Sequence, residues 1–197
     1  MRLGTVKLKN FAFRLSLPSP FIIFAKTIIY HREAMSKIYP VGIQSFEKIR
    51  EGGYCYIDKT SLIYNLVKSG QYYFLSRPRR FGKSLLISTL EAYFLGKKEL
   101  FKGLAMEELE KDWTTYPVLH LDLNARKYVD ASSLNAILNQ HLESWEAIYG
   151  DEKKDRAPEE RFAWLIEKAC RTTGRNVVVL VDEYDKPMLQ SIGNEEL

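Results

Sequence analysis

Residues 177–181, Val-Val-Val-Leu-Val, form the feature of the sequence that most constrains its fold. A strand with no polar side chain on either face is typical of a parallel sheet that is covered on both faces. Two other short apolar runs, 72–75 and 118–123, are separated from it and from each other by segments of helical periodicity. The sequence therefore predicts an α/β domain with a mostly parallel sheet.

Apolar side chains recur at helical spacing around residues 62–67, 85–94, 134–148 and 162–169. A glycine after each segment favours the end of a helix: Gly70, Gly96, Gly150 and Gly174. Pro158 suits the first turn of the last helix. The stretch 97–116 is charged and less regular, and we expect five side chains to anchor it: Phe101, Leu104, Met106, Leu109 and Trp113.

The first 34 residues differ in character from the rest. They carry six basic residues and one acidic residue, so their net charge of +5 leaves −1 for residues 35–197 out of a total of +4. The basic charge therefore belongs to this leader and gives no argument for nucleic-acid binding. We expect a basic leader, 1–34, that is disordered or lies upstream of a natural start at Met35, followed by one domain over 35–197.

An apolar run at 21–25 lies within this leader. Pro18 and Pro20 precede it, and Arg14 and Lys26 bracket it, so it falls well short of the roughly 20 residues of a membrane span. We therefore expect neither an export signal nor a membrane partner. Cys55 and Cys170, like the three histidines, match no metal-ligand spacing. We expect two reduced thiols in a cytoplasmic protein.

A basic turn at residues 77–84 lies between the run 72–75 and the helix that follows. Gly82-Lys83-Ser84 matches the second half of the Walker A pattern, Gly, four residues, then Gly-Lys-Ser/Thr. In this phosphate-binding loop, or P-loop, backbone N–H groups and a helix N-terminus surround the phosphates. Lys83 would add positive charge, and Ser84 would offer its hydroxyl to Mg²⁺. Arg77 departs from the pattern, because it stands at the first glycine.

The turn predicts six nucleotide-binding residues: Arg79, Arg80, Phe81, Gly82, Lys83 and Ser84. An alternative is that Gly-Lys-Ser opens an ordinary helix with a solvated lysine. Three roles remain open for Arg79 and Arg80: contact with phosphates, contact with nucleic acid or another partner, and simple solvation.

Two carboxylates, Asp182 and Glu183, follow the run 177–181 directly. The carboxyl ends of parallel strands form the edge at which α/β proteins bind ligands. Asp182 is therefore placed to hold Mg²⁺ opposite Ser84, as in a Walker B motif. Glu183 is placed to orient the attacking water or to accept its proton. A solvated strand end is the alternative, and the phosphate-loop candidate upstream favours the paired site.

Three motifs together resemble those of the bacterial AAA-ATPase-like family: Tyr56-Ile57-Asp58-Lys59-Thr60, the segment 73–84, and Asp182-Glu183-Tyr184-Asp185-Lys186-Pro187. The likeness runs from about residue 36 to the end, and Arg77 in place of glycine is usual in that family. The resemblance implies a P-loop NTPase fold and ATP binding with Mg²⁺ through Lys83, Ser84, Asp182 and Glu183. Members often carry a C-terminal nuclease-like domain of the PD-(D/E)XK type.

Family members usually have two more strands after the magnesium-site strand, whereas this sequence runs only to Leu197. We therefore expect an incomplete domain, truncated after the Walker B strand and inactive as an ATPase by itself. The leading hypothesis is an ATP-binding module that, when complete, hydrolyses ATP with Mg²⁺ and gates an effector. The alternatives are a nucleic-acid-associated protein that uses the basic loop, and a non-catalytic nucleotide-binding interaction domain.

Overall fold

The structure is a computed structural model that describes residues 38–78, 80–124 and 131–191, without the side chains of residues 131, 188, 190 and 191. The chain divides into two units, Met1–Tyr39 and Pro40–Leu197. All the helices and strands named here belong to the second unit. The predicted leader and its boundary between residues 34 and 35 lie outside the described residues.

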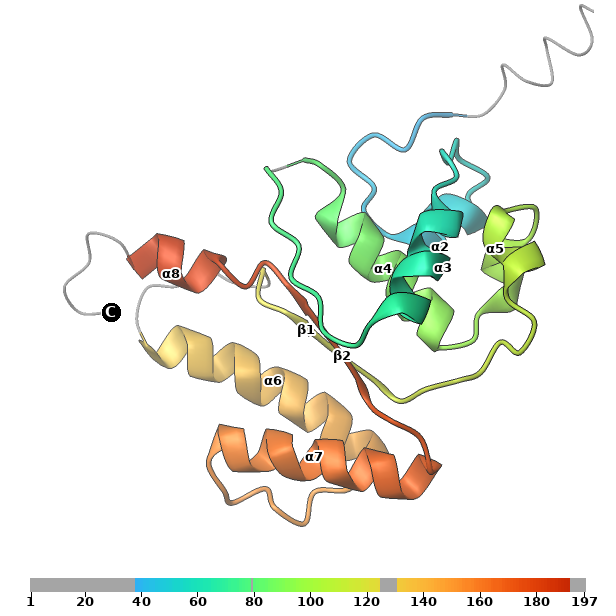
Figure 1. Ribbon diagram of the computed structural model, residues 1–197. Coiled ribbons are helices and arrows are strands. Elements are labelled where there is room, and N and C mark those ends of the chain that lie inside the picture. The colour runs from blue at the N-terminus through green and yellow to red at the C-terminus, as the bar shows by residue number, and fades with distance from the viewer. Residues whose placement is uncertain (1–37, 79, 125–130, 192–197) are drawn as a thin grey trace, which may run out of the picture. The chain divides into compact units, whose positions relative to one another are not determined.

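Helices and strands of the second unit follow one another as in Figure 1. In chain order they are α2 (Phe46–Glu51), α3 (Thr60–Ser69), α4 (Lys83–Phe94), a 3-10 turn η1 (Lys98–Phe101), α5 (Ala105–Leu109), β1 (Val118–Asp122), α6 (Ala131–Tyr149), α7 (Pro158–Thr173), β2 (Val178–Asp182) and α8 (Lys186–Ser191). Of the helices in these described stretches, none is both long and apolar enough to cross a bilayer.

The sheet of the described chain consists of β1 and β2, which pair in parallel from Val118 with Val178 to Asp122 with Asp182. Helix α4 covers one face, where Leu180 joins the core that contains Tyr93. Helices α6 and α7 lie on the other face, where Leu119 packs in a second core. Figure 1 shows these helices on opposite sides of the strands. The predicted α/β class and the parallel pairing are confirmed.

The predicted strand at residues 72–75 is wrong. These residues form no strand, and among the described residues β2 pairs only with β1. The side chains of Tyr72 and Phe74 are 93% and 73% exposed. An aromatic, apolar run favours a strand, but a strand also needs a neighbour for its N–H and C=O groups. No described segment supplies that neighbour.

The expectation that the last strand is covered on both faces holds on one face only. Val179 and Val181, on the side of α6 and α7, are 40% and 41% exposed. The physical reason is that, of the two strands, α6 packs against β1 rather than β2, which leaves these side chains of β2 partly uncovered.

Four helices that the periodicity predicted are present as α3, α4, α6 and α7. Pro158 is the first residue of α7, and Gly174 ends this helix with a left-handed φ of 65°. The sequence did not predict α2, α5 or α8, which have five or six residues each and are too short for a clear period. Leu109 is 42% exposed, so its predicted role as an anchor is wrong.

A buried carboxylate, Glu110, ties three helices together at the end of α5. It is 5% exposed and accepts hydrogen bonds from the hydroxyl of Tyr93, on α4, and from the backbone N–H groups of Lys111 and Asp112 at 3.0 Å each. The ammonium of Lys68, near the end of α3, lies 3.0 Å away. Burial acts to raise the pKa of Glu110, but these donors outweigh it and lower the pKa to about 2.

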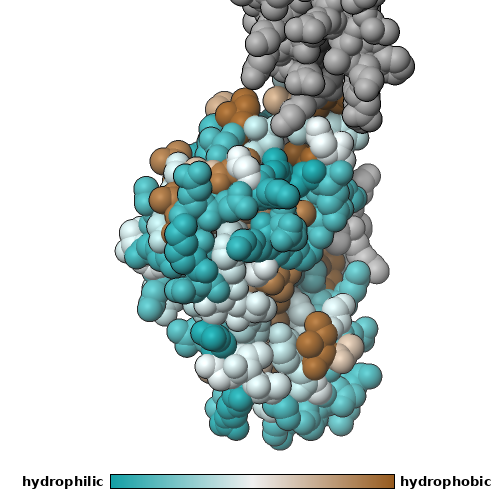
Figure 2. Space-filling view, turned by 90° about the vertical axis from the view of Figure 1, so that its right-hand side faces the viewer, coloured by the Kyte–Doolittle hydropathy of each residue, from teal (hydrophilic) through white to brown (hydrophobic). Residues whose placement is uncertain are grey.

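The surface of the unit is not uniformly polar. Figure 2 shows one face that is largely hydrophilic, with separate small hydrophobic groups rather than one continuous apolar area. Scattered apolar residues of this kind are normal on a protein surface and give no argument for a docking site on this face.

Candidate nucleotide-binding site

Helix α4 begins at the position that the Gly-Lys-Ser motif predicted. Gly82 is its N-cap with φ 73° and ψ 25°, and Lys83 and Ser84 are its first two residues. A Cβ built on Gly82 would meet no atom within 4 Å, so glycine is favoured here by the left-handed backbone and not by crowding. Because no side chain caps this end, the first N–H groups of α4 are open to an anion.

The loop before α4 presents its side chains to solvent. Arg77 and Arg80 are exposed, and Phe81 is 63% exposed. Arg80 has a φ of 67°, so it shares with Gly82 the left-handed region that non-glycine residues rarely enter. Alternating conformations of this type turn successive N–H groups toward one point, as in anion-binding nests. Arg79 lies outside the described residues.

Lys83 and Ser84 are partly exposed, and within the described chain neither the ammonium of Lys83 nor the hydroxyl of Ser84 has a hydrogen-bond or ion-pair partner. Neither side chain is therefore used to hold the fold together. Both groups are therefore available to solvent or to a ligand.

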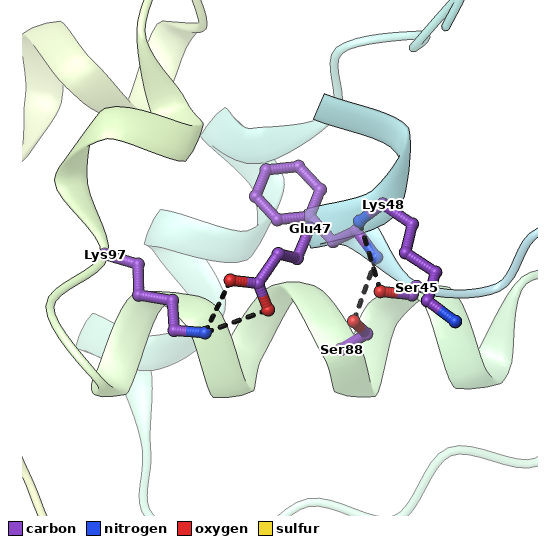
Figure 3. Close-up of polar contacts among 6 residues, drawn as sticks. Ser45, Glu47, Lys48, Ser88 and Lys97 are labelled. Atoms are coloured by element: carbon purple, nitrogen blue, oxygen red, sulfur yellow. Dashed lines mark hydrogen bonds and ion pairs between the residues drawn. The ribbon is translucent and has the colours of Figure 1, made fainter. Parts of the chain in front are cut away.

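Helix α2 fixes the position of α4 (Figure 3). The N–H of Phe46 donates to Oγ of Ser88, on the second turn of α4, at 2.9 Å. Near the other end of α4, Nζ of Lys97 donates to both carboxylate oxygens of Glu47 at 2.8 and 2.9 Å. The ring of Phe46 is fully buried. The second turn and the end of α4 are thus held in a packed scaffold.

Asp182 and Glu183 lie at the carboxyl end of β2, as predicted. Asp182 is the last residue of β2 and is 8% exposed. Its Oδ1 accepts the N–H of Glu183 at 3.0 Å. Glu183 has a φ of 53°, a left-handed conformation that costs energy for a residue with a side chain. Backbone strain of this kind clusters at functional sites, which makes this strand end a candidate site.

One aromatic contact brings the two motifs together. The rings of Phe74, three residues before Arg77, and Tyr184, next to Glu183, lie 5.1 Å apart. Helix α4 also packs against β2. In Figure 1, α4 begins at the end of the unit toward which β1 and β2 run. Within the described residues, no hydrogen bond or ion pair joins Lys83 or Ser84 to Asp182 or Glu183.

Asp122 is a candidate that the sequence reasoning missed. It is the last residue of β1 and the register partner of Asp182, so the two carboxylates end neighbouring strands. Its Oδ1 accepts the N–H of Asn124 at 2.8 Å. A carboxylate at the end of an apolar strand was the signal used for Asp182, and the same signal at the run 118–123 would have found Asp122.

His120 links this strand end to α4. Its Nδ1 lies 3.0 Å from Oε2 of Glu91, on α4. The hydrogen bond with Glu91, helped by the charges of Asp122 and Asp182, raises the pKa of His120. The same bond lowers the pKa of Glu91. His120 therefore joins β1 to the helix that carries Lys83.

The motif around Asp58 serves the scaffold. Oδ1 of Asp58 accepts the N–H of Thr60 at 2.8 Å, and Oδ2 accepts the N–H of Ala105 at 2.7 Å. The hydroxyl of Thr60 in turn accepts the N–H of Met106 at 3.0 Å. One carboxylate thus holds the starts of α3 and α5 together. The link to Ala105 joins residues far apart in the sequence, so no local pattern could predict it.

The third motif is held by Lys186, the first residue of α8. Its ammonium donates to the backbone oxygen and to Oδ1 of Asn124, at 2.8 and 2.9 Å. Asn124 lies two residues after Asp122, so this contact ties the turn that contains Glu183 to the end of β1. Among the described residues, no group of three or more His, Cys, Asp or Glu side chains could hold a metal ion by themselves.

Comparisons with known proteins bear on this site. A sequence model of the family described as "Predicted AAA-ATPase" matches residues 40–197. The chain is also 43% identical over 163 residues to a protein of Azotobacter chroococcum mcd 1 described as "Uncharacterized protein in vnfD 5'region". The match covers 82% of this chain and 31% of that relative, so the chain spans about a third of its length. No solved structure matches. The family match covers all three motifs, and the chain belongs to the predicted AAA-ATPase family.

Proposed function

We propose that this chain binds ATP together with Mg²⁺, with the phosphates at the N-terminus of α4. The observation that carries the proposal is the start of that helix. Gly82 opens it in a left-handed conformation, no side chain caps it, and the side chains of Lys83 and Ser84 have no partner among the described residues. Membership of the predicted AAA-ATPase family supports a nucleotide as the anion that this helix end attracts.

Within this proposal each loop residue has a defined role. The N–H groups from Gly82 onward would donate to the inner phosphates, and Lys83 would neutralise charge on the outer ones. Arg80, with Arg79, would add positive charge beside them. Phe81, which is 63% exposed, would cover one side of the bound phosphates from water. The left-handed φ values of Arg80 and Gly82 support this arrangement, because they turn the intervening backbone toward the helix start.

The residues present fit Mg²⁺ by their chemistry. Ser84 offers a hydroxyl and Asp182 a carboxylate, and hard divalent cations of this size prefer oxygen ligands. Oδ1 of Asp182 already accepts the N–H of Glu183, which leaves Oδ2 for the ion or for a water bound to it. When bound, Mg²⁺ would offset negative charge on the phosphates.

Glu183 is the residue that we propose as the general base. Its carboxylate would orient the attacking water or accept its proton. The turn that contains it is held from two sides, by the ring contact between Tyr184 and Phe74 and by the hydrogen bonds between Lys186 and Asn124. These contacts support a fixed position of Glu183 relative to the loop before Lys83.

The comparison with the relative supports one further part of the proposal. This chain spans 31% of that protein, so a nucleotide site of this kind would form one section of a larger protein. We propose that nucleotide binding or hydrolysis there gates an effector located in the remaining part.

Isothermal titration of the chain with ATP and Mg²⁺ tests the proposed site. We expect saturable binding in the parent and none in Lys83→Ala, because this side chain supplies the charge but no fold contact. Lys98→Ala, which removes a positively charged, exposed side chain from η1, is the control and should bind like the parent. Circular dichroism of both variants should match the parent. Equal ATP affinity of Lys83→Ala and the parent would refute the site.

A further inference from the structure

A pocket lies on the sheet face opposite α4. Its volume is about 240 Å³, and its floor is Leu121, on β1. One wall consists of Leu138, Leu142 and Trp145, from α6, and the other includes Phe162, from α7. Side chains alternate along β1, so Leu121 points away from the face on which His120 meets α4. The pocket is therefore separate from the proposed nucleotide site.

Two aromatic side chains line this pocket and contact each other. The rings of Trp145 and Phe162 lie 5.8 Å apart with an interplanar angle of 43°. Behind Trp145, the ring of His141 stacks at 5.6 Å, and Nε2 of His141 donates to the backbone oxygen of Asp122 at 3.1 Å. Trp145 is only 7% exposed. Its ring is thus held in place by the core.

A buried ion pair further fixes the two helices that form the walls. Arg161, one residue before Phe162, is 5% exposed and donates from Nε and Nη2 to the two carboxylate oxygens of Glu146 at 2.7 and 2.8 Å. Glu146 follows Trp145 directly on α6. A bidentate pair of this kind restricts the relative movement of the two helices. The positions of Trp145 and Phe162 relative to each other are therefore set by the scaffold.

The polar groups at the rim decide which ligand fits. They are the amide of Asn135 and the carboxylate of Glu159, and both residues are exposed. No ion pair or hydrogen bond within the described residues engages the carboxylate of Glu159. An apolar, aromatic cavity with one unpaired carboxylate at its mouth favours a ligand with an apolar body and a positively charged nitrogen.

The volume limits the size of this ligand. Pockets for drug-sized molecules measure roughly 300–1,000 Å³, so a cavity of 240 Å³ takes something smaller. A single aromatic ring system with a short side chain stays within this limit. We infer that the pocket between α6 and α7 binds a small aromatic amine, with its ring against Trp145 and Phe162 and its ammonium at Glu159.

Three probes that share an indole group but differ in charge test this inference. They are tryptamine, which is cationic, indole, which is neutral, and indole-3-acetate, which is anionic. Binding to the full chain is followed by the NMR signals of the tryptophan side-chain N–H groups. We expect tryptamine to shift the Trp145 signal at the lowest concentration and indole-3-acetate at the highest. The Trp113 signal should stay unchanged, because Trp113 packs in the core on the α4 side of the sheet.

Two variants separate the charge from the cavity. Glu159→Gln should weaken tryptamine binding roughly two- to fivefold, as expected for an exposed ion pair, and leave indole binding unchanged. Glu160→Gln, at the neighbouring exposed carboxylate, is the matched control and should change neither. Leu138→Trp should fill the cavity and abolish binding of all three probes, with the Trp113 signal in place as evidence of folding.

Several results would overturn the inference. One is a Trp145 signal that does not move at millimolar tryptamine. Another is an equal response of Trp113 and Trp145, which would mark non-specific association. Equal binding of tryptamine and indole-3-acetate would also refute it, since the carboxylate of Glu159 must distinguish the two. ATP does not enter the experiment, so its outcome is independent of the proposed nucleotide site.

Discussion

Replacement of Glu110 by glutamine is the sharpest test of the scaffold that supports α4. Glutamine keeps the shape of the side chain but removes its charge. The carboxylate of Glu110 is 5% exposed and accepts hydrogen bonds from Tyr93, Lys111, Asp112 and Lys68. We expect the variant to fold with a lower free energy of unfolding.

The magnitude of this loss follows from the pKa of Glu110. A lowering from the ordinary value of 4.5 to about 2 corresponds to about 3 kcal/mol of stabilisation of the charged form. Lys68 is 49% exposed, so solvent screens its share. Glu110→Gln should therefore lower the free energy of unfolding at pH 7 by about 2–3 kcal/mol, within the range for hydrogen bonds to a buried charged group.

The pH dependence of the loss has a definite sign. Because the folded-state pKa is depressed, the stabilisation is fully present above the unfolded-state pKa, near 4.5, and disappears as the pH falls toward about 2. Urea unfolding at pH 7 and pH 3 measures this. The gap between parent and Glu110→Gln should shrink at pH 3. Glu108→Gln, at an exposed site on α5, is the control and should change little. A gap below 0.5 kcal/mol at pH 7, roughly the size of an ordinary surface substitution, or a gap that is as large at pH 3 as at pH 7, would refute the reasoning.

Further predictions concern the site and the leader. Gly82→Ala should lower the free energy of unfolding by about 1–2 kcal/mol in urea melts, the cost of a left-handed residue with a Cβ, and should weaken ATP binding in titration calorimetry. In a longer family member that hydrolyses ATP, Glu183→Gln should keep ATP affinity but lose ~10²–10⁴-fold in turnover, measured as phosphate release, whereas Asp182→Asn should reduce the dependence of ATP binding on Mg²⁺. An unchanged rate in the first variant would move the catalytic role elsewhere. Removal of residues 1–34 should leave the melting temperature unchanged, and a clearly lower value would show that the leader packs on the domain.

Much of the fold could be predicted from local patterns. The helices α3, α4, α6 and α7 were predicted because an apolar face of three or more turns and a terminal glycine or proline are local signals. The parallel pairing of β1 and β2 followed from an apolar run with no polar face. The segment 72–75 was predicted wrongly because its structure does not depend on local signals alone. Its composition favours a strand, but whether a strand forms depends on a neighbour elsewhere in the chain.

The candidate site likewise has one part that local sequence predicts and another that depends on contacts between distant residues. Gly82, Lys83 and Ser84 could be predicted at a helix start because the motif is continuous in sequence, and the structure confirms that α4 begins there. The contact between Phe74 and Tyr184 and the hydrogen bonds of Asp58 with Ala105 join residues far apart in sequence. Only the folded chain brings such pairs together. The roles of Asp182 and Glu183 remain predictions, supported by their place at the end of β2.

Paramagnetic broadening by Mn²⁺ in place of Mg²⁺ tests the central claim most directly. A bound Mn²⁺–ATP complex broadens the backbone amide signals of residues close to the ion. The account predicts that the signals of Gly82, Lys83 and Ser84 and those of Asp182 and Glu183 broaden together, while Lys168, on α7, keeps its signal. Broadening at the start of α4 without broadening at the end of β2, or broadening centred on α7, would contradict it.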